Sequence, residues 1–224
     1  GATECLPVAT ISSAEVLGET AQMTREGKGL CVGKPVKNMQ VKILEITDEA
    51  IETMADATEL EVGKIGEICV HGPVATRSYD NKPEHTRKAK ISDPSLGEDA
   101  FWHRMGDVGY LDEQGRLWYC GRKAHRVETS EGTMFSIQCE AIFNVHDDIF
   151  RSALIGIGER GSQKPVILIE AYPDRSAPSK EEILKLAKSH EITRQIDEVF
   201  FHDGFPVDRR HNAKIHREEL VDWV

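Results

Sequence analysis

The pattern of apolar residues changes once along this 224-residue chain, just after Gly121-Arg122. Before that point the apolar residues form short alternating runs, and after it they form longer runs separated by a helical pattern. A change of this kind predicts two structural units in a mixed α/β and α+β chain. We expect a β-rich unit over residues 1–122 and a small α+β unit over residues 123–224.

Short strands punctuated by glycine mark the first unit. Alternation of apolar and polar residues predicts one strand at 39–43. A second strand is predicted at 67–71, where a short apolar run ends at the turn signal Gly72-Pro73. A third is predicted at 117–120. Such strands favour a small barrel or a folded-over sheet. The polar stretch 82–98, which contains two prolines, is expected to be a loop or a locally disordered segment.

The second unit alternates strands with a helix. Apolar runs at 152–157 and 166–171 predict two strands, and 199–201 predicts a third. Between them, Ser179 is followed three residues later by Glu182, a capping-box signature that opens a helix. This order of elements fits a small α+β unit.

The formal charge of −10 at pH 7 narrows the classes of partner. Binding to nucleic acid needs a cationic surface that neutralises phosphates, so a nucleic-acid-binding protein is disfavoured. A small anionic ligand is compatible with this charge, because a few local cations and a metal can reverse the field inside a cleft. Trp102, Trp118 and Tyr119 are expected in the core, and His103, just before the Arg104 motif, is expected to have a structural role. No apolar run approaches the ~18 residues of a membrane span, so none is expected.

Five widely separated cysteines, at positions 5, 31, 69, 120 and 139, include no Cys-x-x-Cys pair. This spacing predicts neither a zinc site nor a disulfide framework. Reduced thiols fit the cytosol, so a cytoplasmic location is expected. His211 and His216 are five residues apart with no third ligand nearby, and a metal site is not expected there.

Four polar and glycine-rich motifs occur in a fixed order across nearly the whole chain. The first is Gly1-Ala2-Thr3-Glu4, and the second runs from Gly66-Glu67-Ile68 through Gly72-Pro73 to Tyr79 and Thr86. The third runs from Arg104 through Gly106, Asp107 and Gly109 to Gly121-Arg122, and the fourth from Pro206 to Lys214, Ile215 and Arg217. In this order they resemble the motifs of the acyl-CoA synthetase, adenylation-domain and luciferase superfamily of acyl-adenylate-forming enzymes.

This resemblance implies the C-terminal portion of such an enzyme. Residues 1–122 would be the distorted-barrel subdomain of the large AMP-binding domain, and residues 123–224 the small mobile domain with the catalytic lysine. The family's phosphate loop, its adenine-stacking Tyr and most fatty-chain pocket residues precede the Thr-Glu motif and do not occur in these 224 residues. We therefore expect a missing N-terminal segment that carries the phosphate loop, and no adenylation by this chain alone.

The resemblance implies ATP and Mg²⁺ as cofactors and gives the N-terminal motif a role in binding them. Gly1, Ala2 and Thr3 would bind ATP or AMP, with the Thr3 hydroxyl on a phosphate. Glu4 would be an oxygen ligand for Mg²⁺, which prefers carboxylate and phosphate oxygens. The alternative for Glu4 is a solvated surface carboxylate.

The resemblance also assigns ribose and phosphate contacts to Asp107 and Arg122. Asp107 would accept hydrogen bonds from both ribose hydroxyls, a bidentate role that a neutral side chain serves less well. Its flanking glycines would let the backbone approach the nucleotide. The alternatives are an Asp that caps a turn and an arginine that lies on the surface.

Lys214 resembles the family's catalytic lysine because of its distance from Pro206 and the Ile215 and Arg217 that follow. Its ammonium would bridge the attacking carboxylate and the α-phosphate, and so stabilise charge that builds in the transition state. A mobile point charge suits this role better than a planar guanidinium. In isolation the same lysine would pass for part of a basic surface patch. The family usually has Gly where this chain has Ala213.

Segments 1–8, 121–127, 139–144 and 210–215 resemble one branch, the olefin β-lactone synthetases. That branch implies activation of a 2-alkyl-3-hydroxy fatty acid as acyl-AMP and its closure to a β-lactone in bacterial olefin biosynthesis. The implied partners are a long-chain 3-hydroxy acid substrate and other enzymes of the olefin pathway. The hinge departs from the family, because the Asp usual after Gly-Arg is absent and Cys139-Glu140 replaces Pro-x-Glu.

Two other interpretations are open. One is a long-chain acyl-CoA synthetase or fatty acyl-AMP ligase, which passes the acyl group to CoA or to a carrier. The other is a non-catalytic binding or assembly module that retains the fold. The joint presence of Glu4, Asp107 and Lys214 argues against such a module.

Overall fold

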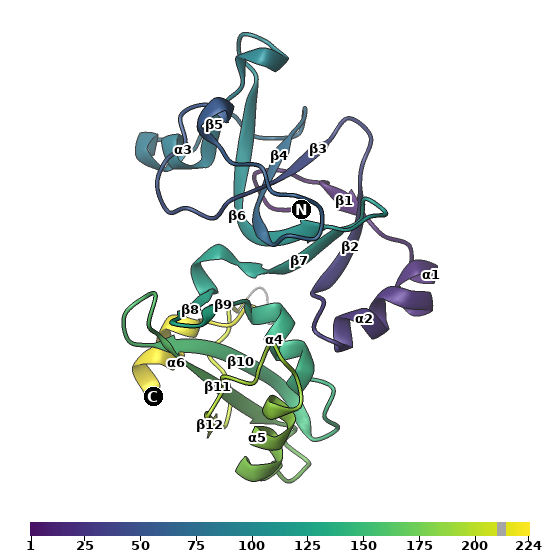
Figure 1. The fold of residues 1–224 in the computed structure, drawn as a ribbon, viewed down its shortest axis with the longest axis vertical. Coiled ribbons are helices and arrows are strands. Elements are labelled where there is room, and N and C mark those ends of the chain that lie inside the picture. Colours follow the sequence, from purple (N-terminus) through teal and green to yellow (C-terminus); the bar gives the residue numbers. More distant parts are fainter. Residues whose placement is uncertain (210–213) are drawn as a thin grey trace. The chain divides into compact units, whose positions relative to one another are not determined.

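A computed structural model describes residues 1–209 and 214–224, which form two compact units (Figure 1). Unit 1 contains Gly1–Ala21 and Leu30–Lys123, and unit 2 contains Gln22–Gly29 and Ala124–Val224. The chain therefore passes from one unit to the other at residues 21–22, 29–30 and 123–124. The division into functional domains at 122–123 stays a prediction, and segment 22–29 lies with the residues that follow that point.

Unit 1 is built on a seven-stranded antiparallel sheet. Its strands are β1 (Ala9–Thr10), β2 (Leu30–Pro35), β3 (Gln40–Leu44), β4 (Gly66–His71), β5 (Lys90–Ser92), β6 (Phe101–Leu111) and β7 (Leu117–Arg122). Six of them lie in the order β1-β2-β7-β6-β4-β3, and β5 pairs with β6. Register shifts interrupt three of the pairings, and irregularities of this kind bend a sheet. The sheet curls into a half barrel, which confirms the fold class expected for this unit.

Apolar clusters lie on both faces of this sheet. Along β4, Ile68 and Val70 point into one cluster and Cys69 into the other, as the alternation of side chains in a strand requires. Trp102 and Trp118 are almost completely buried, which confirms their expected core positions. The strands predicted at 39–43, 67–71 and 117–120 correspond to β3, β4 and β7.

The stretch 82–98 has regular structure, so the prediction of a loop or disordered segment is wrong. It contains the helix α3 (Pro83–Ala89), the strand β5 and a 3₁₀ turn (Pro94–Leu96). Pro83 lies in the first turn of α3, where its missing N–H leaves no hydrogen bond unmade. Strand β5 buries Ile91 completely, and burial of such a side chain contributes about 2 kcal/mol.

A short helical segment links β1 to unit 2. Helix α1 (Ser13–Glu15) continues through a π-helical turn (Val16–Thr20) into α2 (Ala21–Arg25). The turn after α2 packs inside unit 2 at Gly27, whose backbone φ of +80° favours glycine. A Cβ atom at Gly27 would lie 2.4 Å from Ile192 Cδ1 and 3.2 Å from Ile142 Cδ1.

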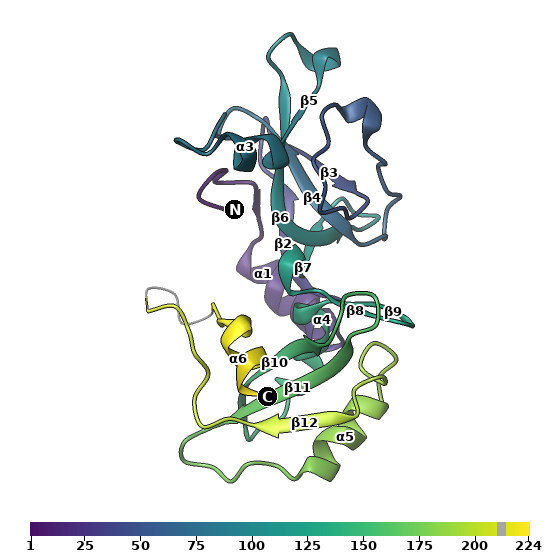
Figure 2. The same ribbon diagram turned by 90° about the vertical axis from the view of Figure 1, so that its left-hand side faces the viewer.

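Unit 2 is an α+β unit whose helices cover both faces of a three-stranded sheet (Figure 2). Strands β10 (Ile149–Ile157) and β11 (Lys164–Ala171) are antiparallel, and β12 (Glu198–Phe201) runs parallel to β11. Helices α4 (Ser136–Phe143) and α5 (Lys180–Lys188) pack on one face and α6 (Arg217–Trp223) on the other. A separate hairpin joins β8 (Val127–Thr129) to β9 (Gly132–Met134).

The predicted helix after Ser179 is α5. The Ser179 hydroxyl accepts a hydrogen bond from the Glu182 N–H at 3.2 Å, and Ile183 and Ala187 are buried. The three strands predicted for this unit correspond to β10, β11 and β12. No helix in the described part of the chain is long and apolar enough to cross a membrane.

Candidate functional site

A cavity of about 510 Å³ lies in unit 1 beside the N-terminal motif. All six residues predicted to bind the nucleotide or Mg²⁺ line it, namely Gly1, Ala2, Thr3, Glu4, Asp107 and Arg122. These residues come from the N-terminus, from β6 and from the end of β7. The fold therefore gathers three separate parts of the sequence around one space.

A tight turn presents the N-terminal motif to the cavity. The Ala2 N–H donates to the Cys5 carbonyl at 3.0 Å and the Cys5 N–H donates to the Ala2 carbonyl at 2.9 Å. Thr3 and Glu4 therefore lie at the tip, and the fully buried Cys5 anchors the turn. The Thr76 N–H donates to the Glu4 carbonyl at 2.8 Å, which fixes the backbone that carries this carboxylate.

Asp107 and Arg122 face each other across the β6–β7 pair. Arg122 Nη1 donates to Asp107 Oδ1 at 3.0 Å, and the Asp107 side chain is 17% exposed whereas that of Arg122 is 47% exposed. Burial raises the pKa of Asp107, and the Arg122 charge partly opposes this rise. A desolvated carboxylate beside a cation can accept hydrogen bonds from a diol while the cation contacts a phosphate.

The glycines that flank Asp107 have different roles. Gly106 has a φ of +65°, a left-handed conformation that glycine adopts without strain. At Gly109 a Cβ atom would lie 2.2 Å from the Trp118 carbonyl oxygen, so the absence of a side chain lets β6 approach β7. Gly109 therefore serves the packing of β6 against β7, whereas the sequence led us to expect that it would let the backbone approach a nucleotide.

An apolar wall completes the cavity, formed by Val8, Ala9, Val32, Ile68, Met105, Leu117 and Tyr119. Tyr119 was expected in the core, but it is only partly buried and contributes to this wall. The alternation of β7 provides the signal, because Tyr119 lies on the same face of the strand as Leu117, which also lines the cavity, and Trp118 lies on the other face. An aromatic and aliphatic wall opposite polar groups fits a planar base joined to a charged phosphate.

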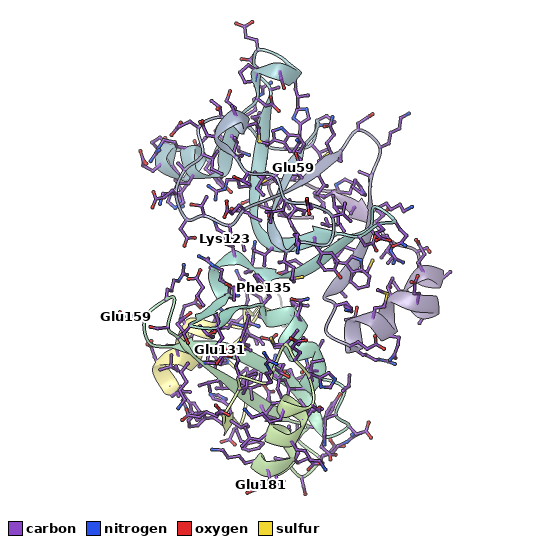
Figure 3. The ribbon with its side chains drawn as sticks, viewed as in Figure 1. Glu59, Lys123, Glu131, Phe135, Glu159 and Glu181 are labelled. Atoms are coloured by element: carbon purple, nitrogen blue, oxygen red, sulfur yellow. The ribbon has the colours of Figure 1, made fainter. Side chains whose placement is uncertain are left out.

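Arg104, three residues before Asp107, is structural. Its Nε and Nη2 donate to Glu67 Oε2 at 3.0 and 2.6 Å in an almost fully buried ion pair. Its other donations go to backbone carbonyls, those of Thr47, Glu49 and Lys88. Lys123, labelled in Figure 3, also donates to Glu67 Oε2, at 3.2 Å. This network fixes the stretch of β6 that leads to the cavity.

Three titratable side chains that were not predicted as site residues, Tyr79, Lys90 and His103, interact electrostatically with Glu4. Burial raises the pKa of Tyr79, and the Glu4 carboxylate raises it further. Burial lowers the pKa of Lys90 to about 8, and the Lys90 ammonium donates to the Thr76 carbonyl. His103 lies opposite Lys90 in the β5–β6 pair and is buried, in agreement with its expected structural role.

The buried His103 predicts an acid-sensitive unit 1. Burial, reinforced by the Lys90 charge, lowers its pKa from 6.5 to about 4. Between these values the unfolded chain binds a proton that the folded chain does not. The free energy of unfolding is therefore unaffected by His103 above pH 6.5 and falls as the pH drops towards 4. We expect the urea midpoint to fall between pH 7 and pH 5, and the fall to be smaller in His103→Asn. The exposed His85→Asn serves as control. If the urea midpoint of His103→Asn fell between pH 7 and pH 5 as much as that of the unmodified protein, this account would be contradicted.

Glu4 fits a Mg²⁺ ion that binds together with phosphates. No group of three or more His, Cys, Asp or Glu side chains among the described residues could hold a metal ion. Mg²⁺ at nucleotide sites is commonly bound by one or two carboxylates together with phosphates and water. A single half-buried carboxylate at the rim of the cavity matches such a donor set.

Lys214 belongs to unit 2, and its backbone lies beside that of residues 207 and 208. The Asp208 N–H donates to the Lys214 carbonyl at 2.9 Å, and Val207 pairs with Ile215 in an isolated bridge. Ile215 is buried whereas Lys214 is exposed. The preceding motif residues Arg210, His211, Asn212 and Ala213 lie outside the described residues.

Sequence comparison finds curated relatives along the whole chain, although no family model matches it. The chain is 46% identical over 229 residues to an olefin β-lactone synthetase of Xanthomonas campestris pv. campestris, and 45% identical over 227 residues to one of Stenotrophomonas maltophilia. Each match covers 100% of this chain and 41% of the relative, so the chain spans about two fifths of their length. A long-chain-fatty-acid–CoA ligase of Yersinia pestis is 25% identical over 223 residues, 99% of this chain and 34% of the ligase.

Solved structures with the same fold include two synthetases. An o-succinylbenzoate coenzyme A synthetase of Bacillus subtilis in complex with AMP has a TM-score of 0.72 at 22% identity, over 98% of this chain and 39% of that chain. An amide bond synthetase of Marinactinospora thermotolerans has a TM-score of 0.69 at 23% identity, over 86% of this chain and 36% of that chain. These likenesses confirm the fold class, and with the sequence matches they confirm the resemblance to adenylate-forming enzymes.

Proposed function

We propose that this chain, a homologue of olefin β-lactone synthetases over its whole length, works in an enzyme that activates a carboxylic acid with ATP. The observation that carries the proposal is the convergence of Thr3, Glu4, Asp107 and Arg122 on one cavity with an apolar wall. We further propose that an N-terminal segment supplies the phosphate loop, as the resemblance implies. The five widely separated cysteines, which include no Cys-x-x-Cys pair, support a reducing, cytoplasmic location.

In the first step, the residues of the cavity would hold ATP. Asp107 would accept hydrogen bonds from the ribose hydroxyls, and Arg122 and the Thr3 hydroxyl would contact phosphate oxygens. Glu4 would hold Mg²⁺, whose charge offsets that of the phosphates when it is bound. The substrate carboxylate then attacks the α-phosphorus, the bond to the β-phosphate breaks, and pyrophosphate leaves. The Lys214 ammonium would stabilise the charge that develops between the two reactants.

In the second step, we propose that a 2-alkyl-3-hydroxy fatty acid closes its own ring. The β-hydroxyl oxygen attacks the acyl carbon, the bond to AMP breaks, and the hydroxyl proton is released. Closure from a free carboxylate would have to expel hydroxide, a poor leaving group, whereas the mixed anhydride expels AMP. Because the nucleophile is tethered, the entropic cost of bringing two molecules together is absent.

A product analysis tests this proposal. We expect the intact enzyme to convert ATP and a 2-alkyl-3-hydroxy fatty acid to β-lactone, AMP and pyrophosphate without CoA. The matched 2-alkyl acid that lacks the hydroxyl is the control, and it should stop at acyl-AMP. A requirement for CoA or a carrier, with a thioester as product, would overturn ring closure.

The second candidate is a long-chain acyl-CoA synthetase or fatty acyl-AMP ligase. It is supported by the match to the Yersinia pestis ligase along nearly the whole chain. Both candidates share the adenylation step and therefore the same use of the cavity. Adding CoA to the assay distinguishes them, because a β-lactone synthetase should form lactone at an unchanged rate and a CoA ligase should form the thioester instead.

A further inference from the structure

The segment 206–216, which carries Lys214, begins directly after a backbone group held by a buried carboxylate. The Phe205 N–H donates to Glu170 Oε2 at 2.7 Å. Arg151 holds the same carboxylate, with Nε 2.6 Å from Oε2 and Nη2 3.1 Å from Oε1. Glu170 lies on β11 and is 8% exposed, so its direction is set by the sheet.

A second buried carboxylate holds the residue that follows the segment. Arg217, the first residue of α6, donates from Nη2 to Glu140 Oε1 at 2.6 Å. The same oxygen accepts the Leu154 N–H at 2.9 Å, which ties Glu140 to β10. Glu140 lies on α4 and is 5% exposed.

Backbone contacts hold the two ends of this segment, residues 206–208 and 214–216, against each other, and the segment is called the loop below. The His216 N–H donates to the Pro206 carbonyl at 2.9 Å, and the Asp208 N–H donates to the Lys214 carbonyl at the same distance. Phe205 and Ile215 are buried in one cluster with Leu220 of α6. The backbone of Lys214 is therefore fixed by its neighbours while its side chain stays exposed.

Neither carboxylate is well explained as a source of stability alone. A buried ion pair often stabilises a fold less than apolar side chains of the same volume, because both charges lose their hydration. The Nε of Arg217 is also buried without a hydrogen-bond partner in the described part of the chain, which is a further cost. Both pairs act at the ends of the same segment, and charge-assisted hydrogen bonds fix direction as well as distance.

We infer that Glu140 and Glu170 are positioning residues for Lys214, and that each carboxylate fixes one end of the loop 206–216. This inference rests on the proposed function only where Lys214 is taken as the lysine of adenylation. It adds two residues from α4 and β11 that touch neither nucleotide nor substrate. Their effect on the reaction passes through the backbone of the loop.

Glu140→Gln and Glu170→Gln in the intact enzyme test the inference, because each removes a charge and keeps the shape. We expect the kcat of pyrophosphate release to fall ~10- to 100-fold, since small displacements of a catalytic group cost that much. The KM for ATP should change less than about threefold, because the cavity residues belong to unit 1. Arg217→Lys, which keeps a cation beside Glu140, should recover part of the rate that Arg217→Met loses.

Thr193→Val is the matched control. It removes a buried hydrogen bond from Thr193 Oγ1 to the Ala187 carbonyl, of 2.7 Å, in the same unit but away from the loop. We expect it to lower the melting temperature as much as the glutamate variants do, and to leave kcat unchanged when assayed well below that temperature. A rate loss in Thr193→Val equal to that of the glutamate variants would show that stability alone explains them.

Hydrogen exchange of the same proteins gives a readout that does not depend on activity. In the glutamate variants the amides of Asp208 and His216 should exchange at least about tenfold faster, while those of β10 and β11 keep their protection. Unchanged exchange at 208 and 216, or faster exchange throughout unit 2, would overturn the inference. If the unmodified enzyme forms no acyl-adenylate, the proposed function fails, and the exchange rates still decide whether the carboxylates position the loop.

Discussion

Replacement of Lys214 by Ala in the intact enzyme should reduce pyrophosphate release ~10²- to 10³-fold, the loss typical when one group that stabilises transition-state charge is removed. The methyl group of Ala leaves no cation for the oxygens that meet at the α-phosphorus. AMP should bind with unchanged affinity, because the cavity residues lie in unit 1 and Lys214 in unit 2. Pyrophosphate release and calorimetric binding of AMP measure the two effects.

Two variants make this experiment specific. Lys214→Arg keeps the charge but replaces a compact ammonium with a planar guanidinium, so we expect it to stay at least about tenfold below the unmodified enzyme. Lys180→Ala removes an exposed lysine from the first turn of α5 and should be fully active. A Lys214→Ala enzyme that consumes the acid at a normal rate would remove the basis of the adenylation proposal.

The second large effect is expected at Asp107. Asp107→Ala removes the carboxylate proposed for the ribose diol and leaves Arg122 without its 3.0 Å partner. Hydrogen bonds to a charged group are worth about 1.5–3 kcal/mol each, so the loss of two of them should raise the Kd for AMP at least ~100-fold. Direct binding to AMP measures this effect, and the exposed Asp99→Asn is the control. Equal affinities in Asp107→Ala and the unmodified protein would exclude a ribose role.

The same carboxylate predicts a pH dependence of binding. Burial raises the pKa of Asp107 above its ordinary value of 3.8, so the group gains a proton at a higher pH than a solvated aspartate. The protonated group is a poorer acceptor for two hydroxyls. AMP affinity should therefore fall as the pH is lowered through this raised pKa. Asp107→Asn should bind weakly at every pH and show no such fall.

Local patterns were sufficient for much of the fold. Alternation predicted β3, glycine-containing turns beside short apolar runs predicted β4 and β7, and the cap at Ser179 predicted α5. The stretch 82–98 was missed because α3 and β5 are short, and β5 depends on pairing with β6 and on the burial of Ile91. Nothing local in 22–29 indicates that it packs in unit 2.

The site was predicted by resemblance rather than by spacing. Gly1 and Arg122 are far apart in sequence, and only the curled sheet brings them to one cavity. Tyr119 could have been placed on the cavity wall from the alternation of β7. Glu140 and Glu170 could not have been found in this way, because the sequence pattern does not distinguish a buried glutamate from an exposed one.

The discontinuity of unit 2 has a practical consequence for limited proteolysis. Because segment 22–29 of the 1–123 product packs in unit 2, a protease that cuts only the Lys123–Ala124 bond should leave the two products associated without a covalent link. A polypeptide begun at Ala124 would lack the turn at Gly27 and leave Ile142 and Ile192 uncovered, so it should aggregate. When a ribosome has synthesised residues 1–123, only segment 22–29 of unit 2 has been made. This segment cannot pack until the remaining hundred or so residues have been synthesised.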